Sequence, residues 1–176
     1  HGVRTCVGTE TPLVVPDAVR ARLGNTGEAP DIARRLYAAM FRRITATHPL
    51  DYYWFWTPER WTWEGTNEAQ VKATLDDLSA AVAAAEEADA PFALATCGWV
   101  LGPQSDRALF DRVLPAGMAI SCINRAVGHD PVEPGFAGIE WRGKWAIPWL
   151  EDDFALTLPQ LWAGRMRRDA ADALVY

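Results

Sequence analysis

The 176-residue sequence predicts an α/β fold in which parallel strands alternate with helices that cover the sheet. Three observations lead to this prediction. Short apolar runs are bounded by turn residues or charges, helical patterns lie between these runs, and the composition, with 49% hydrophobic and 23% charged residues, is that of a globular domain. A chain of this length can bury a sizeable core, so we expect one domain over residues 1–176.

Five strands are expected, and each is a short run of apolar, aromatic or β-branched residues. Their ranges are 4–8, 51–56, 92–99, 118–123 and 144–150. The successive starts are therefore 47, 41, 26 and 26 residues apart. A (β/α)₈ barrel averages about 31 residues per unit. The spacing thus predicts a partial barrel of the TIM type, with about five parallel β/α units.

Helical patterns occupy the segments between these strands. The first begins at Asp31, the second is capped by Asn67 or Thr66, a short third begins at Ser105, and a final one begins at Thr157. The first two carry apolar stripes at helical spacing. The stripes consist of Ile32, Leu36, Met40 and Ile44 in the first helix, and of Val71, Leu75, Leu78 and Val82 in the second.

The chain is expected to be an interior fragment of a longer barrel protein. It starts at His1 without a methionine, ends within a helical pattern, and five units cannot close an eight-stranded barrel. We place the five strands at positions three to seven of a parent barrel. The compartment of that parent is left open, with secretion or a periplasmic location as possibilities. No Gly-rich phosphate loop follows the first strand, which disfavours a dinucleotide-binding sheet.

Tryptophan is the most informative residue type, because nine are present and most lie at expected strand ends or in the loops that follow. An indole is a flat apolar plate with one N–H donor, which suits the C–H face of a sugar ring. Several of these side chains could equally be core fillers. The candidates for sugar binding are Trp56, Trp61, Trp63, Trp99 and Trp149.

Acidic residues follow the same strands. Glycosidases need two carboxyl groups that flank the scissile bond. We expect Glu59 to act as the general acid and Asp152 or Glu151 to be its partner. Four further polar residues after strands are candidates for contacts with substrate hydroxyls, although each could instead be a helix cap or a structural ion-pair partner. They are Glu10, Asn124, Arg125 and Asp153.

Other chemistries fit the sequence less well. The lysines, Lys72 and Lys144, are not placed for a Schiff base, and the three histidines do not form a metal-ligand cluster. A magnesium-dependent enolase-like site using Glu10 and Asp153 would lack a lysine base. We therefore expect no cofactor and no metal.

The segments Tyr52-Tyr-Trp-Phe-Trp-Thr-Pro-Glu59 and Trp145-Ala-Ile-Pro-Trp-Leu-Glu-Asp-Asp153 resemble those of barrel glycoside hydrolases, in particular bacterial proteins near the family-20 hexosaminidases and the α-glucuronidases. In the largest retaining clan, the acid/base glutamate follows strand four and the nucleophile follows strand seven. The resemblance therefore implies these roles for Glu59 and the 151–153 cluster. That clan typically has an Asn-Glu pair after strand four, whereas this sequence has Pro58-Glu59. The substrate and the retaining or inverting outcome of hydrolysis therefore stay open.

The sequence thus predicts a glycoside hydrolase fragment that acts on an oligosaccharide or a glycoside. A carbohydrate-binding barrel without catalysis is the alternative. Neither a nucleic-acid nor a membrane partner is expected, because the net charge is −6 and no long apolar run occurs.

Overall fold

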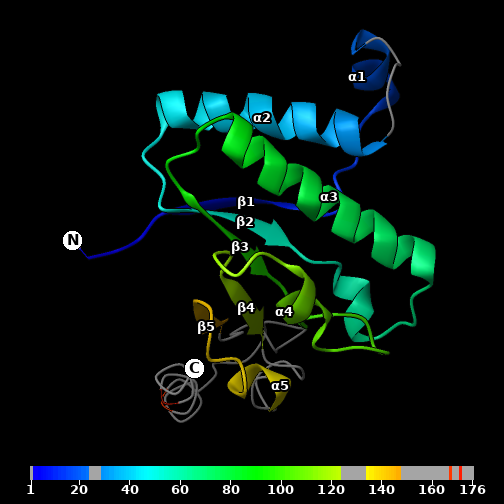
Figure 1. The fold of residues 1–176 in the computed structure, drawn as a ribbon, viewed down its shortest axis with the longest axis vertical. Helices are drawn as coiled ribbons and strands as arrows, with labels where there is room; N and C mark the ends of the chain where they lie inside the picture. The colour runs from blue at the N-terminus through cyan, green and yellow to red at the C-terminus, as the bar shows by residue number, and fades with distance from the viewer. Residues whose placement is uncertain (1, 24–28, 124–133, 148–166, 168–170, 172–176) are drawn as a thin grey trace, which may run out of the picture. The chain divides into compact units, whose positions relative to one another are not determined.

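The computed structural model describes residues 2–23, 29–123, 134–147, 167 and 171. The chain divides into two compact units. The first unit comprises His1–Pro58 and Thr66–Ala95, and the second comprises Glu59–Gly65 and Thr96–Tyr176. Figure 1 shows the elements in chain order.

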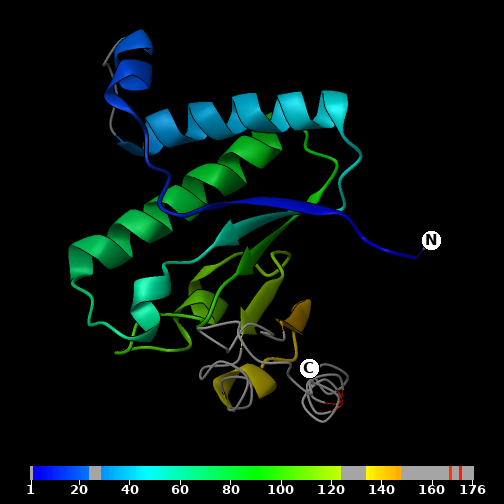
Figure 2. The ribbon, with the colours of Figure 1, turned by 180° about the vertical axis from the view of Figure 1, so that it is seen from behind.

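The first unit is built on a small sheet with the strand order β1-β2-β3. The strands are β1 (Cys6–Glu10), β2 (Tyr52–Trp56) and β3 (Ala93–Cys97), of which β3 continues into the second unit. β1 and β2 are parallel, with Cys6 opposite Tyr52 and Glu10 opposite Trp56. The helices of this unit are α1 (Asp17–Arg22), α2 (Ala29–Thr47) and α3 (Glu68–Glu87). Figures 1 and 2 show that α2 and α3 lie on the same side of this sheet.

Helix α3 begins where the sequence predicts. The side chain of Asn67 accepts a hydrogen bond from the backbone N–H of Gln70, and the side chain of Gln70 accepts one from Asn67. This capping box satisfies two backbone donors at the helix start, so the prediction of a cap at Asn67 is confirmed. The helix ends at Glu87, shortly before Asp89, whose φ of 48° cannot continue a right-handed helix.

Aromatic side chains fill the space between the two long helices and the sheet. Tyr37 and Phe41 of α2 meet Phe55 and Tyr53 of β2 edge-on, with ring centroids 5.6 and 4.9 Å apart. These four side chains are between 0% and 1% exposed. Burial of this much aromatic area is the main apolar contribution to the stability of the unit.

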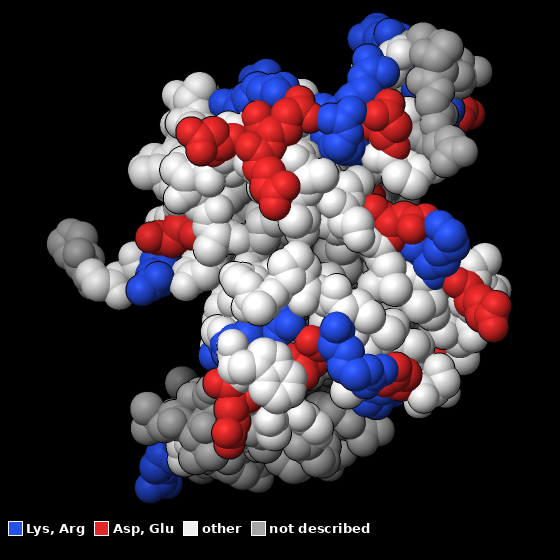
Figure 3. Space-filling model, viewed as in Figure 1, with Lys and Arg blue, Asp and Glu red and all other residues white. Residues whose placement is uncertain are grey.

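The outer surfaces of α2 and α3 are charged. In the view of Figure 3, acidic and basic side chains are interspersed over these helices. Glu87 at the end of α3 pairs with Arg34 and with Arg42 of α2, the latter at 2.8 Å. These pairs hold the pKa of the Glu87 carboxyl below its usual range, the hydrogen bond from Arg42 being the largest cause.

The second unit contains a short 3₁₀ helix, η1 (Glu59–Thr62), and two parallel strands. The strands are β4 (Ile120–Ile123) and β5 (Lys144–Ile147), with Ile120 opposite Lys144. Two short helices of this unit have bounds within the described residues, α4 (Leu109–Val113) and α5 (Pro134–Ala137).

A buried arginine holds the second unit together locally. The guanidinium of Arg142 donates to the carboxylate of Asp111 at 3.0 Å and to the carbonyl oxygens of Asp111, Leu114, Pro115 and Met118 at 2.8–3.0 Å. The side chains of Arg142 and Asp111 are 2% and 6% exposed. All five N–H donors of the Arg142 guanidinium are therefore used, and they fix the end of α4 to the turn before β4.

The predicted partial barrel is wrong. A strand lies in or overlaps each of the five expected ranges, but the strands form two small parallel sheets, β1-β2-β3 and β4-β5, rather than five β/α units of a TIM barrel. A barrel requires one continuous ladder and a covering helix after each strand. The segments with the 26-residue spacing carry helices of only five and four residues, fewer than two turns each. Such helices cannot cover a barrel strand.

Candidate functional site

The sheet of the first unit has one face that none of its described helices covers. Side chains alternate between the two faces along a strand, and residues opposite each other in register share a face. Tyr53 and Phe55 point to α2 and α3, so their neighbours in β2 point the other way. We call the residues of this second face the open face: Cys6, Gly8, Glu10, Tyr52, Trp54 and Trp56.

Glu10 and Trp56 lie side by side at one end of the open face. They are opposite each other in the register, at the last positions of two parallel strands. The backbone N–H of Thr11 donates to the carbonyl oxygen of Trp56 at 2.9 Å, which keeps the strands paired up to this point. Glu10 is exposed and Trp56 is half-buried, so an exposed carboxylate lies next to a partly accessible indole.

A basic residue marks the other end of the open face. The guanidinium of Arg4 lies over the ring of Tyr52, 5.6 Å from its centroid, and donates to its hydroxyl at 3.0 Å. Asp51 nearby accepts hydrogen bonds from the backbone N–H and the hydroxyl of Thr5. These bonds lower the pKa of the Asp51 carboxyl, the backbone donor being the largest cause. They also fasten the start of β1 to the start of β2.

Gly8 at the middle of the open face allows the two strands to approach. A Cβ atom at this position would lie 2.4 Å from the carbonyl oxygen and 2.9 Å from the Cβ of Trp54. Both distances are shorter than van der Waals contact, so any side chain here would displace β2. Gly8 itself therefore adds no side chain beside Trp54.

The covered face contains a buried polar cluster that the sequence did not reveal. One carboxylate oxygen of Asp77 accepts hydrogen bonds from the hydroxyls of Thr11, at 2.7 Å, and Tyr37, at 2.8 Å. Burial raises the pKa of the Tyr37 phenol, and the charge of Asp77 raises it further. The only sequence signal was an aspartate on the buried side of a helix, because the three residues are far apart along the chain.

The predicted site residues after β2 belong to the second unit. Glu59 begins η1 and is exposed. Trp61 is 4% exposed and stacks on Phe110 at a centroid distance of 5.6 Å, which favours the core-filling interpretation for this side chain. Arg107 donates to the carbonyl oxygen of Trp61 at 2.8 Å and so anchors η1.

Trp63 is the more accessible aromatic side chain of this segment. It is 56% exposed, and its ring is tilted against that of Trp99, which is 3% exposed, at a centroid distance of 5.4 Å. The buried ring of Trp99 thus packs against one part of the Trp63 ring. The rest of the Trp63 ring is accessible to solvent.

The other predicted site residues lie outside the described part of the chain. They are Glu151, Asp152, Asp153, Asn124, Arg125 and Trp149. The pairing of Glu59 with a carboxylate in 151–153 therefore stays a prediction. Within the described residues, no group of three or more His, Cys, Asp or Glu side chains is arranged to hold a metal ion. The described helices also include none that is both long and apolar enough to cross a bilayer.

No protein-family model, curated protein or solved structure matches this chain. The resemblance to glycoside hydrolases therefore stays a prediction from two sequence segments.

Proposed function

We propose that this chain is a carbohydrate-active α/β protein that binds a saccharide on the open face. One observation carries the proposal: Glu10 and Trp56 are adjacent at the carboxyl ends of two parallel strands, on a face without a described helix of the same unit. In open α/β sheets, ligands bind at this end of the strands. The indole of Trp56 would stack on the C–H face of a sugar ring, and the carboxylate of Glu10 would accept hydrogen bonds from its hydroxyls.

Glycoside hydrolysis is the activity proposed for the intact protein. Glu59 would protonate the leaving group, and Asp152 or Glu151 would act as nucleophile or base, as the two-carboxylate mechanism requires. Support comes from the position of Glu59, three residues after Trp56 in the chain and ahead of the exposed ring of Trp63. Substrate and stereochemical outcome are left open by this proposal.

A binding function without catalysis is the second candidate. It is favoured by the exposure of Glu59, because the acid of a glycosidase is usually set in an apolar pocket. In that case Glu10 and Trp56 would still contact a saccharide on the open face, but no bond would be cleaved.

Turnover of a panel of aryl glycosides by the intact protein, together with calorimetric binding of oligosaccharides, tests both candidates. Trp56→Ala should weaken saccharide binding by about tenfold or more, which corresponds to about 1.4 kcal/mol. Trp141→Ala is the matched control, because Trp141 is 62% exposed and lies outside the open face. Equal losses in both variants would remove the open face from recognition.

Glu59→Gln separates the two candidates. If the protein is a glycosidase, this variant should keep saccharide binding and lose most turnover, because the amide cannot donate a proton to the leaving group. Unchanged turnover would exclude Glu59 from the mechanism. Saccharide binding by a parent protein that turns over none of the glycosides would favour the non-catalytic candidate.

A further inference from the structure

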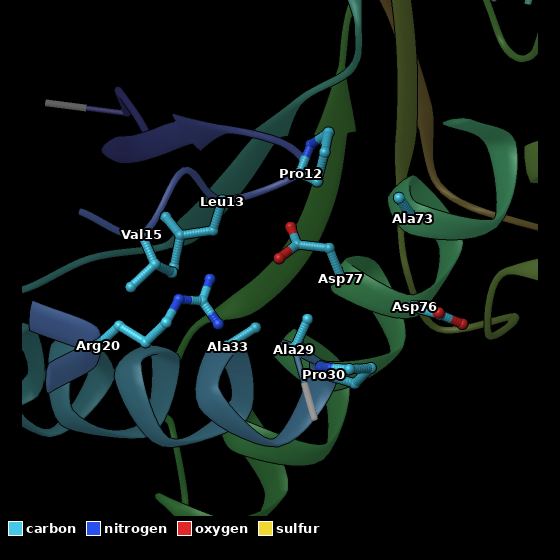
Figure 4. A pocket seen from close by; sticks show the side chains of 10 residues that line it. All are labelled: Pro12, Leu13, Val15, Arg20, Ala29, Pro30, Ala33, Ala73, Asp76 and Asp77. Atoms are coloured by element: carbon cyan, nitrogen blue, oxygen red, sulfur yellow. The ribbon is translucent and has the colours of Figure 1, made fainter. Parts of the chain in front are cut away.

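A hollow of about 160 Å³ lies on the covered side of the first unit, after the end of β1. Figure 4 shows the ten side chains that line it. They come from the segment after β1, from α1, from the start of α2 and from α3. Most are small or apolar, and the charged ones are Arg20, Asp76 and Asp77.

Asp77 presents its second carboxylate oxygen, Oδ1, to this hollow. The side chain is 5% exposed, and its Oδ2 atom accepts the hydrogen bonds from Thr11 and Tyr37. Oδ1 accepts no hydrogen bond from any residue that the structure describes, and Figure 4 shows the carboxylate pointing into the hollow. A hydrogen bond between a cationic donor and a carboxylate oxygen is charge-assisted, so a cationic group placed in the hollow next to Oδ1 would be stabilising.

Arg20 points into the same hollow from α1, toward Asp77 (Figure 4). It is half-buried, and its side chain makes no hydrogen bond or ion pair with another described residue. Asp76 differs from both, because it pairs with Lys72 at 2.5 Å and points away from Asp77. The hollow is therefore lined by a carboxylate whose Oδ1 faces it and by a guanidinium, and these two groups have opposite charges.

We propose that this hollow binds a small aliphatic amino acid, with its ammonium group on Oδ1 of Asp77 and its carboxylate on Arg20. The two protein charges cancel, so a ligand with one charge of each sign complements them without leaving a net charge in the site. Charge-assisted hydrogen bonds are about twice as strong as neutral ones, and the guanidinium fork matches a carboxylate. Leu13, Pro30 and Ala33 offer an apolar wall to the methylene chain between the charged ends. The site is separate from the open face and does not depend on the saccharide proposal.

The test is isothermal calorimetry of the intact protein with an ω-amino acid series from glycine to 6-aminohexanoic acid. Butylamine and butyrate, which each carry one charged end, are the ligand controls. We expect one chain length to bind best, and both controls to bind at least tenfold more weakly. Arg20→Met should weaken the best ligand by at least tenfold, whereas Arg22→Met, at an exposed position of the same helix, should leave its affinity unchanged.

Asp77→Asn should also abolish binding, but this change could unfold the protein because Asp77 anchors Thr11 and Tyr37. The Arg20→Met result therefore decides the matter, with unchanged circular dichroism as the check on folding. No heat from any amino acid, or equal binding of glucose and the zwitterions, would overturn the proposal. A double-mutant cycle of unfolding free energies in the ligand-free protein gives a further test. Strong coupling between Arg20→Met and Asp77→Asn would overturn the proposal, because Arg20 would then pair with Asp77 itself.

Discussion

The two faces of the β1–β2 pair differ sharply although they are made by alternate residues of the same two strands. On the covered face, Tyr53 and Phe55 are 1% and 0% exposed and contact the aromatic rings of α2. On the open face, Tyr52, Trp54 and Trp56 are only half-buried. Adjacent positions of one strand thus differ in role: those on the covered face hold the unit together, whereas those on the open face leave aromatic surface accessible, which is where we propose that a saccharide binds.

The largest expected effect concerns the covered face. Phe55→Ala should lower the free energy of unfolding by about 3–5 kcal/mol, because it empties a fully buried ring site. Urea denaturation followed by circular dichroism measures this loss. Trp56→Ala, one residue further along, should cost clearly less. If the two changes cost the same, the open face is part of the core and the distinction between the faces fails.

The polar cluster of the covered face should contribute next. Tyr37→Phe removes one of the two hydroxyls that donate to Asp77 and should cost about 1.5–3 kcal/mol, the range for hydrogen bonds to charged groups. Thermal and urea unfolding of this variant give the value. A cost of less than about 0.5 kcal/mol would mean that Asp77 is satisfied in another way.

Gly8→Ala tests the close approach of the strands on the open face. The new methyl group would lie 2.4 Å from the carbonyl oxygen of Trp54, so β2 must shift, at a cost of about 1–3 kcal/mol. Gly65→Ala is the control, because nothing lies within 4 Å of a Cβ there. Similar denaturation midpoints for both variants would show that the strands are not close at Gly8.

The smallest effect at neutral pH is expected for Tyr53→Phe, which keeps the buried ring. Burial, with a contribution from Asp77, raises the pKa of Tyr53 to about 12. Because this folded-state pKa exceeds the unfolded value of about 10, the stabilisation is complete below pH 10 and is lost as the pH rises through about 12. A phenolate absorbance titration should show a step near pH 12 that Tyr53→Phe removes and Tyr52→Phe retains. A step that survives Tyr53→Phe would contradict this assignment.

The local elements could be predicted from the sequence better than their assembly. The aromatic run before Pro58 identified β2, and Asn67 identified the start of α3. The stripe predicted for α2 was correct at Ile32, but the other buried residues of this helix are Ala33, Tyr37, Ala38 and Phe41 rather than Leu36, Met40 and Ile44. The four-residue spacing predicted the helical period correctly. The predicted buried face was shifted by one residue along the sequence, because the spacing alone does not determine how the helix is rotated about its axis.

The barrel prediction failed because strand pairing is a long-range property. The short apolar runs of β3 and β4 predicted two strands, but they did not show which strand lies beside each of them. The candidate site shows the same limit. Glu10 and Trp56 could be named from their positions after strands, and their adjacency required the register. Asp77 was missed because its partners Thr11 and Tyr37 are 66 and 40 residues away in the chain.

The outer edge of β1 has a consequence for handling this protein at high concentration. Among the described strands β1 pairs with β2 alone, and it exposes Cys6, Val7 at 48% and a row of backbone donors and acceptors. No proline or lysine interrupts Cys6–Glu10, so only the charge of Glu10 opposes the addition of a second chain. Edge-to-edge aggregation of the isolated polypeptide should therefore begin at this strand, and an oxidising buffer could trap the aggregates through Cys6.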